Sequence, residues 1–286
     1  MIGGSRVNAF PRTEVGGVSL PRMIIGTNWF FGFSHCTPAK NALINRVVDR
    51  KQMADIMEVF VRAGVDATMG PDRPELFQGA RDVEDRVGAK VTIISTPTLP
   101  LDRQGFIFEE VARILDSNAE HGATFCMPHT STTDTMVDRL AREIRQMDRV
   151  CSMIRERGMI PGLSTHLPET IIFADETGLD VETYISIYNL MGFLMPLEVD
   201  WTADVIRNAR KPVMTIKPMA AGQIRPFQAL NFVWNTIRPC DMVTVGTMTP
   251  DEARELIETS LAILERREST VELQQTRSKA MLKTRT

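Results

Sequence analysis

The sequence has few of the residues and motifs on which several protein classes depend. Its four cysteines are widely spaced and form no CxxC pair: Cys36, Cys126, Cys151 and Cys240. This argues against a disulfide framework or a structural zinc knuckle. No window approaches the roughly 20 apolar residues of a membrane-spanning helix, and no apolar signal segment follows the first basic residue. We therefore expect a cytoplasmic protein with reduced thiols and no membrane partner.

Basic patches with interleaved aromatic residues and a GxGxxG turn are also missing. The first absence argues against nucleic acid as a partner. The second argues against a doubly wound dinucleotide-binding sheet, which remains the alternative fold. What is present fits one large domain, since the chain has 286 residues, of which 43% are apolar and 24% charged, with a formal net charge of −3. Such a chain can bury a sizeable core.

Strand-like and helix-like segments alternate along the chain. Short apolar runs predict eight strands: Met23–Gly26, Val65–Thr68, Lys90–Ser95, Thr124–Met127, Ile160–Ser164, Tyr184–Tyr188, Val213–Ile216 and Met242–Val245. Apolar residues at helical spacing predict helices at Lys51–Ala63, Pro74–Val87, Phe106–Ala119, Asp134–Arg157, Pro168–Thr177, Leu197–Ala209 and Phe227–Ile237. An eighth helix is predicted to begin at Pro250, after the N-cap residue Thr249. Eight strand-helix pairs in a chain of this length predict a (β/α)8 TIM barrel, whose site lies on the loops after the strands.

The end of the chain differs from the barrel segments. The barrel domain is expected to span residues 1–265, and residues 266–286 form a polar, basic tail. We favour a mobile terminus over a tail that contacts another subunit. A homo-oligomer remains open.

Polar and reactive side chains concentrate where the predicted strands end. In chain order they are Asn28, His35, Asp66, Thr96, Thr98, His129, His166, Asn189, Lys217, Gly246 and Thr247. Three of the four histidines belong to this set. Because neighbouring strands lie roughly 4.8 Å apart, imidazoles on adjacent strand ends can share one ligand. The alternative for each histidine alone is a hydrogen-bonded structural residue.

The segment from Asn28 to Ala42 is long and apolar for a simple connection. It holds several aromatic residues beside His35 and Cys36, and such a loop commonly covers a site. We expect the substrate to contact residues of this loop and one residue after the sixth strand: Asn28, Trp29, Phe31, His35 and Asn189.

The turn after the last predicted strand has features of an anion site. Gly246 opens it, Thr249 stands at the N-cap position before Pro250, and acidic residues follow in the first helical turn. The turn that Gly246 opens is therefore expected to be an anion site.

Several motifs together resemble the aldo-keto reductase superfamily. They are GGVSLPRMIIGT near the N-terminus, AGVDAT at Ala63–Thr68, GLSTH at Gly162–His166, SIYN at Ser186–Asn189, KPMAAGQI at Lys217–Ile224 and VTVGTMTPDEARELIE at Val243–Glu258. The resemblance implies a barrel whose base is closed by an N-terminal β-hairpin. It also implies hydride chemistry with an Asp, a Tyr, a Lys and a His. The last turn would be a cofactor-phosphate loop, in which Gly246 and Thr247 contact the cofactor.

The chain departs from the family pattern where that hydride chemistry takes place. Asp66 matches the aspartate and His129 lies close to the histidine, but no tyrosine follows Asp66 within a few residues. Thr96 and Thr98 stand where the lysine is expected. The resemblance therefore implies that nicotinamide chemistry is lost or altered, with an NADP(H)-dependent oxidoreductase as the alternative.

The residues that remain predict proton transfer on a small polar substrate, carbohydrate-like or a hydroxy acid, by an isomerase, lyase or hydrolase. Asp66, His129 and His166 are expected to converge on a substrate hydroxyl or on a divalent ion such as Zn or Mn, with one imidazole as base. Lys217 would stabilise an oxyanion or a substrate carboxylate. A non-catalytic ligand-binding barrel is the further alternative.

Overall fold

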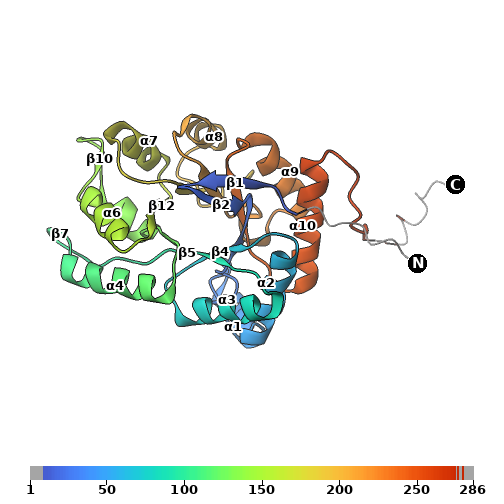
Figure 1. Ribbon diagram of the computed structural model, residues 1–286. Coiled ribbons are helices and arrows are strands. Elements are labelled where there is room, and N and C mark those ends of the chain that lie inside the picture. The colour runs from blue at the N-terminus through green and yellow to red at the C-terminus, as the bar shows by residue number, and fades with distance from the viewer. Residues whose placement is uncertain (1–8, 275, 277–278, 280–286) are drawn as a thin grey trace.

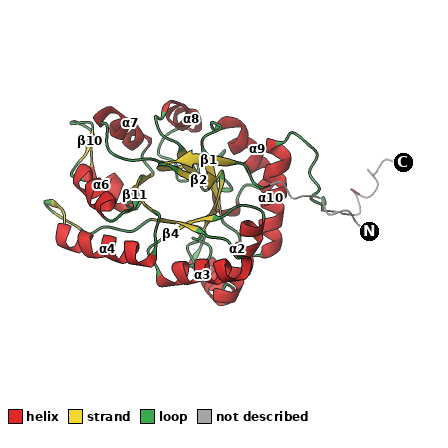
Figure 2. Cartoon of the chain, in the orientation of Figure 1, coloured by secondary structure: helices red, strands yellow, loops and turns green. Residues whose placement is uncertain are grey.

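Strands form the centre of the molecule and helices surround them (Figures 1 and 2). The computed structural model describes residues 9–274, 276 and 279. The central sheet has the order β11-β8-β5-β4-β3-β15-β14-β13-β12. Its members are β3 (Met23–Gly26), β4 (Ala67–Gly70), β5 (Thr92–Ser95), β8 (Phe125–Cys126), β11 (Ile160–Pro161), β12 (Leu163–Thr165), β13 (Tyr184–Ile187), β14 (Val213–Ile216) and β15 (Met242–Val245).

The sheet closes on itself because its two end members are consecutive pieces of one strand. β11 pairs with β8, β12 pairs with β13, and Gly162 lies between the two pieces. A Cβ atom at Gly162 would stand 2.7 Å from the Thr183 carbonyl oxygen, so the close approach of neighbouring backbone requires glycine. The result is a parallel barrel of eight strands, which confirms the predicted (β/α)8 fold.

The helices form an outer ring around this barrel (Figure 2). The longer helices are α1 (Pro38–Val47), α2 (Arg50–Arg62), α3 (Pro74–Val87), α4 (Phe108–His121), α6 (Met147–Glu156), α7 (Pro168–Thr177), α8 (Val199–Asn208), α9 (Pro226–Thr236) and α10 (Pro250–Leu264). The one-turn helix α5 (Thr130–Thr133) lies in the loop after β8 and contributes Thr130 to the cavity at the strand ends. Short 3-10 turns cover Asp134–Met136 and Ala220–Gly222, and small antiparallel pairs join β6 (Leu101–Asp102) to β7 (Gly105–Phe106) and β9 (Val137–Asp138) to β10 (Glu143–Ile144).

An N-terminal hairpin closes the base of the barrel, as the family resemblance implies. Strands β1 (Arg12–Val15) and β2 (Val18–Pro21) are joined by Gly16 and Gly17, whose φ angles of 56° and 79° suit a two-residue hairpin turn. Val15 and Leu20 of the hairpin are fully buried and pack with residues inside the barrel: Ile24, Ala67, Met69, Ile94, Phe125, Met127, Ile185, Met214 and Met242. The amino-terminal end of the barrel is therefore filled with side chains.

Two expectations about local structure are wrong. The helix predicted over Asp134–Arg157 is a 3-10 turn, the β9-β10 pair and α6. The Asp138 side chain accepts the backbone N–H groups of Leu140 and Ala141, and this local turn competes with a helix. The second strand is β4 at Ala67–Gly70 rather than Val65–Thr68, which moves Asp66 in front of the strand.

The described residues contain no helix with the length and apolar character needed to cross a membrane. The last barrel helix, α10, ends at Leu264. The tail predicted over residues 266–286 stays a prediction, and its positions 275, 277–278 and 280–286 lie outside the described residues, as do residues 1–8 at the other end.

Candidate functional site

A cavity of about 540 Å³ lies at the carboxyl ends of the barrel strands. Residues that end strands contribute to its wall: Gly26, Met69, Gly70, Ile216 and Val245. The loops after the strands supply its polar groups, which include Asn28, His35, Thr96, His129, His166 and Lys217. The sequence therefore predicted the correct end of the barrel and several of the side chains gathered there.

His129 is held by the backbone that it caps. It is the N-cap of α5, its Nδ1 accepts the backbone N–H of Ser131 at 3.2 Å, and Nδ1 lies 2.8 Å from Ser131 Oγ. Because Nδ1 is an acceptor, the neutral ring carries its proton on Nε2. Burial and then the charge of Lys217 lower the His129 pKa, whereas Asp134 raises it. At neutral pH, His129 is a neutral donor.

Asp134 forms hydrogen bonds to both of the loops that carry His129 and His166. Its Oδ2 accepts Thr130 Oγ1 at 2.6 Å in the loop after β8, and the backbone N–H of His166 at 3.0 Å after β12. Its Oδ1 accepts Thr165 Oγ1 at 2.5 Å. The carboxylate fixes the relative position of the loops without lining the cavity.

The His166 ring has different surroundings. No hydrogen bond joins its ring nitrogens to another of the described residues, although its backbone N–H is held by Asp134. Burial, followed by the charges of Lys217, His129 and His35, lowers the His166 pKa to about 4. The ring is therefore a neutral base with both nitrogens available to a ligand.

Lys217 is a largely buried cation at the end of β14. Burial lowers its pKa to about 8. Within residues 9–274, its ammonium has no ion pair or hydrogen bond. Its φ of 60° is in the left-handed region, which is strained for lysine and is typical of functional sites. The ammonium faces the cavity, where water or a polar or anionic group of a ligand can accept its hydrogen bonds.

Two residues of the loop after β3, Trp29 and His35, line the cavity. His35 Nε2 lies 3.4 Å from Asn28 Nδ2, and burial followed by Lys217 lowers the His35 pKa to about 4. Phe31 does not line the cavity as expected, because its ring lies 5.3 Å from the Arg73 guanidinium. The cation-π contact turns Phe31 away from the site.

The placement of Asp66 at the rim is wrong. Asp66 precedes β4 and its Oδ1 accepts a hydrogen bond from Arg12 of the hairpin at 2.9 Å, so it lies at the base of the barrel. The expected Asp66-His129-His166 metal set therefore does not converge. No group of three or more His, Cys, Asp or Glu side chains among the described residues is arranged to hold a metal ion.

Asn189 also has a structural role rather than the expected contact with substrate. It is fully buried, and its side-chain amide exchanges two hydrogen bonds with the Phe193 backbone, at 3.0 and 2.8 Å. It thereby fixes the loop after β13.

Both tyrosines of the chain lie outside the cavity. Tyr184 Oη donates to Asp175 Oδ1 at 2.7 Å, and the Tyr188 ring packs against Phe232. Neither occupies the place of a phenolic proton donor.

Gly246 and Thr247 line the cavity, but the turn that follows is not a free anion site. Glu252 Oε2 accepts the backbone N–H groups of Met248 and Thr249 at 2.7 and 3.2 Å. This is the capping box of α10, and its carboxylate occupies the donors that a phosphate would use. The Thr247 hydroxyl is buried without a partner in the described structure. The residues therefore do not fit a cofactor phosphate at this turn.

Some site residues were not identified from the sequence. Asp134 fell inside a predicted helix, and no local pattern marks it. Ser164, Met69 and Arg225 line the cavity without a distinctive motif. The capping role of Glu252, in contrast, could have been found from its spacing of three residues from Thr249.

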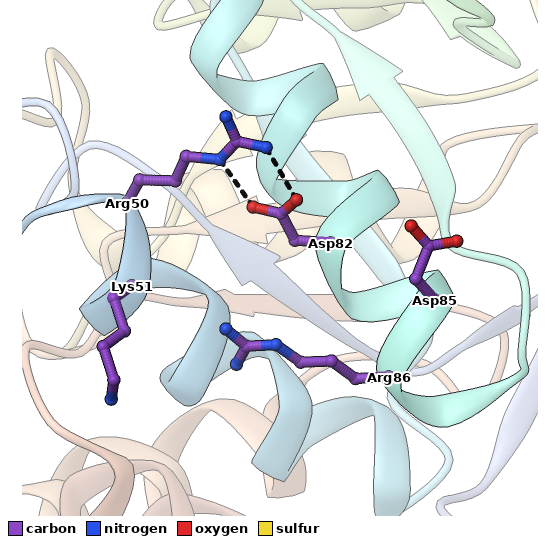
Figure 3. A pocket seen from close by; sticks show the side chains of 5 residues that line it. All are labelled: Arg50, Lys51, Asp82, Asp85 and Arg86. Atoms are coloured by element: carbon purple, nitrogen blue, oxygen red, sulfur yellow. Dashed lines mark hydrogen bonds and ion pairs between the residues drawn. The ribbon is translucent and has the colours of Figure 1, made fainter.

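A second hollow lies on the outer surface between α2 and α3 (Figure 3). Figure 3 shows the Arg50 guanidinium facing the Asp82 carboxylate, with N···O distances of 2.6 and 2.7 Å. Arg86 pairs with Asp55. These exposed ion pairs belong to the helix layer and are separate from the strand ends.

The barrel, the hairpin and the cavity together define the fold of the aldo-keto reductases. A protein of Pseudomonas aeruginosa assigned to that group is 15% identical, with a TM-score of 0.64, over 92% of this chain and 100% of its own. An aldo-keto reductase from Klebsiella pneumoniae in complex with NADPH is 15% identical, with a TM-score of 0.55, over 92% of each chain. These similarities confirm the fold.

A protein with another activity also has a similar fold, so the fold alone does not define the reaction of this chain. A truncated 3-deoxy-D-arabino-heptulosonate 7-phosphate synthase from Thermotoga maritima is 12% identical, with a TM-score of 0.54, over 90% of this chain and 93% of its own. No protein-family model and no curated protein matches the sequence. The fold therefore does not identify a reaction, and the side chains of the site are the remaining indication of function.

Proposed function

We propose that the chain is a divergent barrel enzyme of the aldo-keto reductase type that transfers protons on a small polar carbonyl or hydroxy-acid substrate. The observation that supports this is the meeting of His129, His166 and Lys217 in one cavity, with both tyrosines elsewhere. The site thus has bases and a cation but lacks the phenolic donor of a reductase.

In this mechanism each side chain has its own role. His166, neutral and without a hydrogen bond to its ring, accepts a proton from a carbon next to the substrate carbonyl. His129 donates from Nε2 to a substrate oxygen, because Nδ1 is already an acceptor. Lys217 stabilises the negative charge that develops on the enolate oxygen.

Substrate binding would also strengthen the base. The charge of Lys217 contributes to the lowered pKa of both His129 and His166. A polar or anionic group bound beside Lys217 offsets that charge and raises the imidazole pKa values towards neutrality. The site is therefore matched to substrates that bring negative charge or a polarised oxygen.

Deuterium exchange tests this function without knowledge of the product. The full-length chain, without a histidine tag, is incubated in D₂O with dihydroxyacetone, glyceraldehyde or glycolate, and exchange at carbon is followed by NMR. We expect exchange that falls by about 100-fold or more in His166→Gln and His129→Gln. His121→Gln is the matched control, since His121 stacks on Phe77 outside the cavity. Full activity in both test variants would contradict the proposal.

A second candidate is an NADP(H)-dependent oxidoreductase. The similarity in fold to the NADPH-bound reductase from Klebsiella pneumoniae favours it. The Glu252 carboxylate at the last turn and the positions of both tyrosines disfavour it. NADPH oxidation with the same carbonyl compounds separates the two functions.

A further inference from the structure

We propose that Lys217 is a covalent nucleophile that forms an imine with a small hydroxyketone or keto acid bound in the cavity. The proposal rests on the proposed function in one respect, because the imine becomes useful when His166 moves a proton on the attached carbon. It goes further by naming the bond formed and the substrate class.

The first support is the unpaired state of the amine. Lys211, for comparison, lies on the surface and pairs with Glu182 at 3.0 Å. Lys217 lines the cavity at the end of β14 and has no carboxylate partner in the described part of the chain. The amine is therefore free to meet the carbonyl carbon of a ligand in the cavity.

The backbone provides a second and independent support. The loop that begins at Lys217 holds three non-glycine residues at positive φ: Lys217 at 60°, Ala220 at 48° and Ala221 at 58°. Such strain persists where the surrounding structure fixes it and is typical of functional sites. Here it fixes the start of the side chain where the strand ends and the cavity begins.

The acid-base surroundings suit amine chemistry. The titratable groups that respond to the Lys217 charge are His35, His129 and His166, and all are neutral at neutral pH. Burial lowers the Lys217 pKa to about 8, so part of the amine is unprotonated near neutral pH. The free amine is the nucleophile. Arg225 and the carboxylates Glu252 and Glu255 also line this cavity.

The step balances without a further reactant. The unprotonated fraction of Lys217 adds to the carbonyl carbon as the free amine. The proton lost by the ammonium is taken up by His166, whose pKa rises once the lysine charge is gone. The resulting carbinolamine loses its oxygen as water when the imidazolium returns the proton. Overall, the lysine ammonium and the ketone give a protonated imine and water, with no change in charge. The protonated imine withdraws electrons, which makes the neighbouring C–H more acidic for His166.

Reductive trapping tests this bond directly. The full-length protein is incubated with dihydroxyacetone or pyruvate and cyanoborohydride, which supplies hydride to the protonated imine and leaves a stable secondary amine. Peptide mass mapping then compares Lys217 with two exposed lysines, Lys51 and Lys90. We expect Lys217 to be labelled by at least one ketone about 10-fold or more above either surface lysine at pH 7, because its amine is more often unprotonated.

Two variants complete the test. Lys217→Arg keeps the positive charge but cannot form the imine, so site-specific label should vanish while the protein stays folded by circular dichroism. His166→Gln should slow labelling, because it removes the proton carrier. Labelling of Lys217 at or below the level of the surface lysines with both ketones would overturn the imine. If Lys217 is not labelled but deuterium exchange still depends on His166, the imine is wrong and the proposed function is retained.

Discussion

The Asp134 carboxylate accepts the backbone N–H of His166 at 3.0 Å from a position 32 residues earlier in the chain. The same carboxylate holds Thr130 next to His129. One side chain outside the cavity thus links the two loops that carry the imidazoles.

Replacement of this carboxylate should therefore affect the site more than the fold. We expect Asp134→Asn to lower deuterium exchange by about 10-fold to 100-fold, because an amide nitrogen cannot accept these hydrogen bonds and the loops shift. NMR titration should show a lower His129 pKa, since Asp134 raises that pKa. Asp148→Asn, on the exposed face of α6, is the control. An unchanged His129 titration would refute a positioning role.

NADPH binding provides a prediction about the last turn. We expect no saturable binding of NADPH at micromolar concentrations, because Glu252 already accepts the backbone N–H groups of Met248 and Thr249. Glu252→Gln removes the charge but keeps an acceptor, so it should strengthen any residual binding. Fluorescence titration measures both proteins, with Glu265→Gln as control. Micromolar affinity in the unmodified protein would show that this interpretation of the turn is wrong.

Lys217 is expected to reduce stability at neutral pH. Its folded-state pKa of about 8 lies below the ordinary value of 10.5, so the unfolded chain binds more protons between these values. The stability of the unmodified protein should therefore rise as pH increases from about 8 to about 10.5. Lys217→Met should be more stable at pH 7 by about 1 to 3 kcal/mol and should lack this rise. Denaturant unfolding at several pH values measures the free energy of unfolding. Lys211→Met is the control and should not be more stable than the unmodified protein at pH 7.

Asp66 is predicted to matter for stability alone. Asp66→Asn weakens the ion pair with Arg12, whose side chain is 35% exposed, so the free energy of unfolding should fall by about 0.5 to 1 kcal/mol. Deuterium exchange and ketone trapping should stay at the level of the unmodified protein. A large loss of either activity, with stability preserved, would place Asp66 in the reaction after all.

The sequence predicted those features that depend on local pattern. Alternating strands and helices gave the barrel, and the ends of the predicted strands gave His129, His166 and Lys217. The predictions that were wrong concern side chains whose contacts lie far away in the sequence. Asp66 pairs with Arg12 at a separation of 54 residues, and Phe31 lies on Arg73. No periodicity in the short AGVDAT segment shows which of its residues starts the strand, so the position of β4 was two residues in error.

The side chains that organise the cavity were hardest to predict for the same reason. Asp134 and Asn189 act through hydrogen bonds to backbone groups, and the geometry of those groups exists only after the loops have formed. Strand ends therefore predict the side chains that line the cavity more readily than those that hold these side chains in place.

The hairpin that turns at Gly16 and Gly17 affects how a ligand can enter and leave the cavity. Because Val15 and Leu20 fill the barrel at its base, the described residues leave the carboxyl ends of the strands as the entrance to the cavity. Under the proposed function, reactant and product would share this entrance, so a product molecule would have to leave before the next reactant binds. Inhibition by product is therefore expected to be competitive with the reactant, whatever the reaction proves to be.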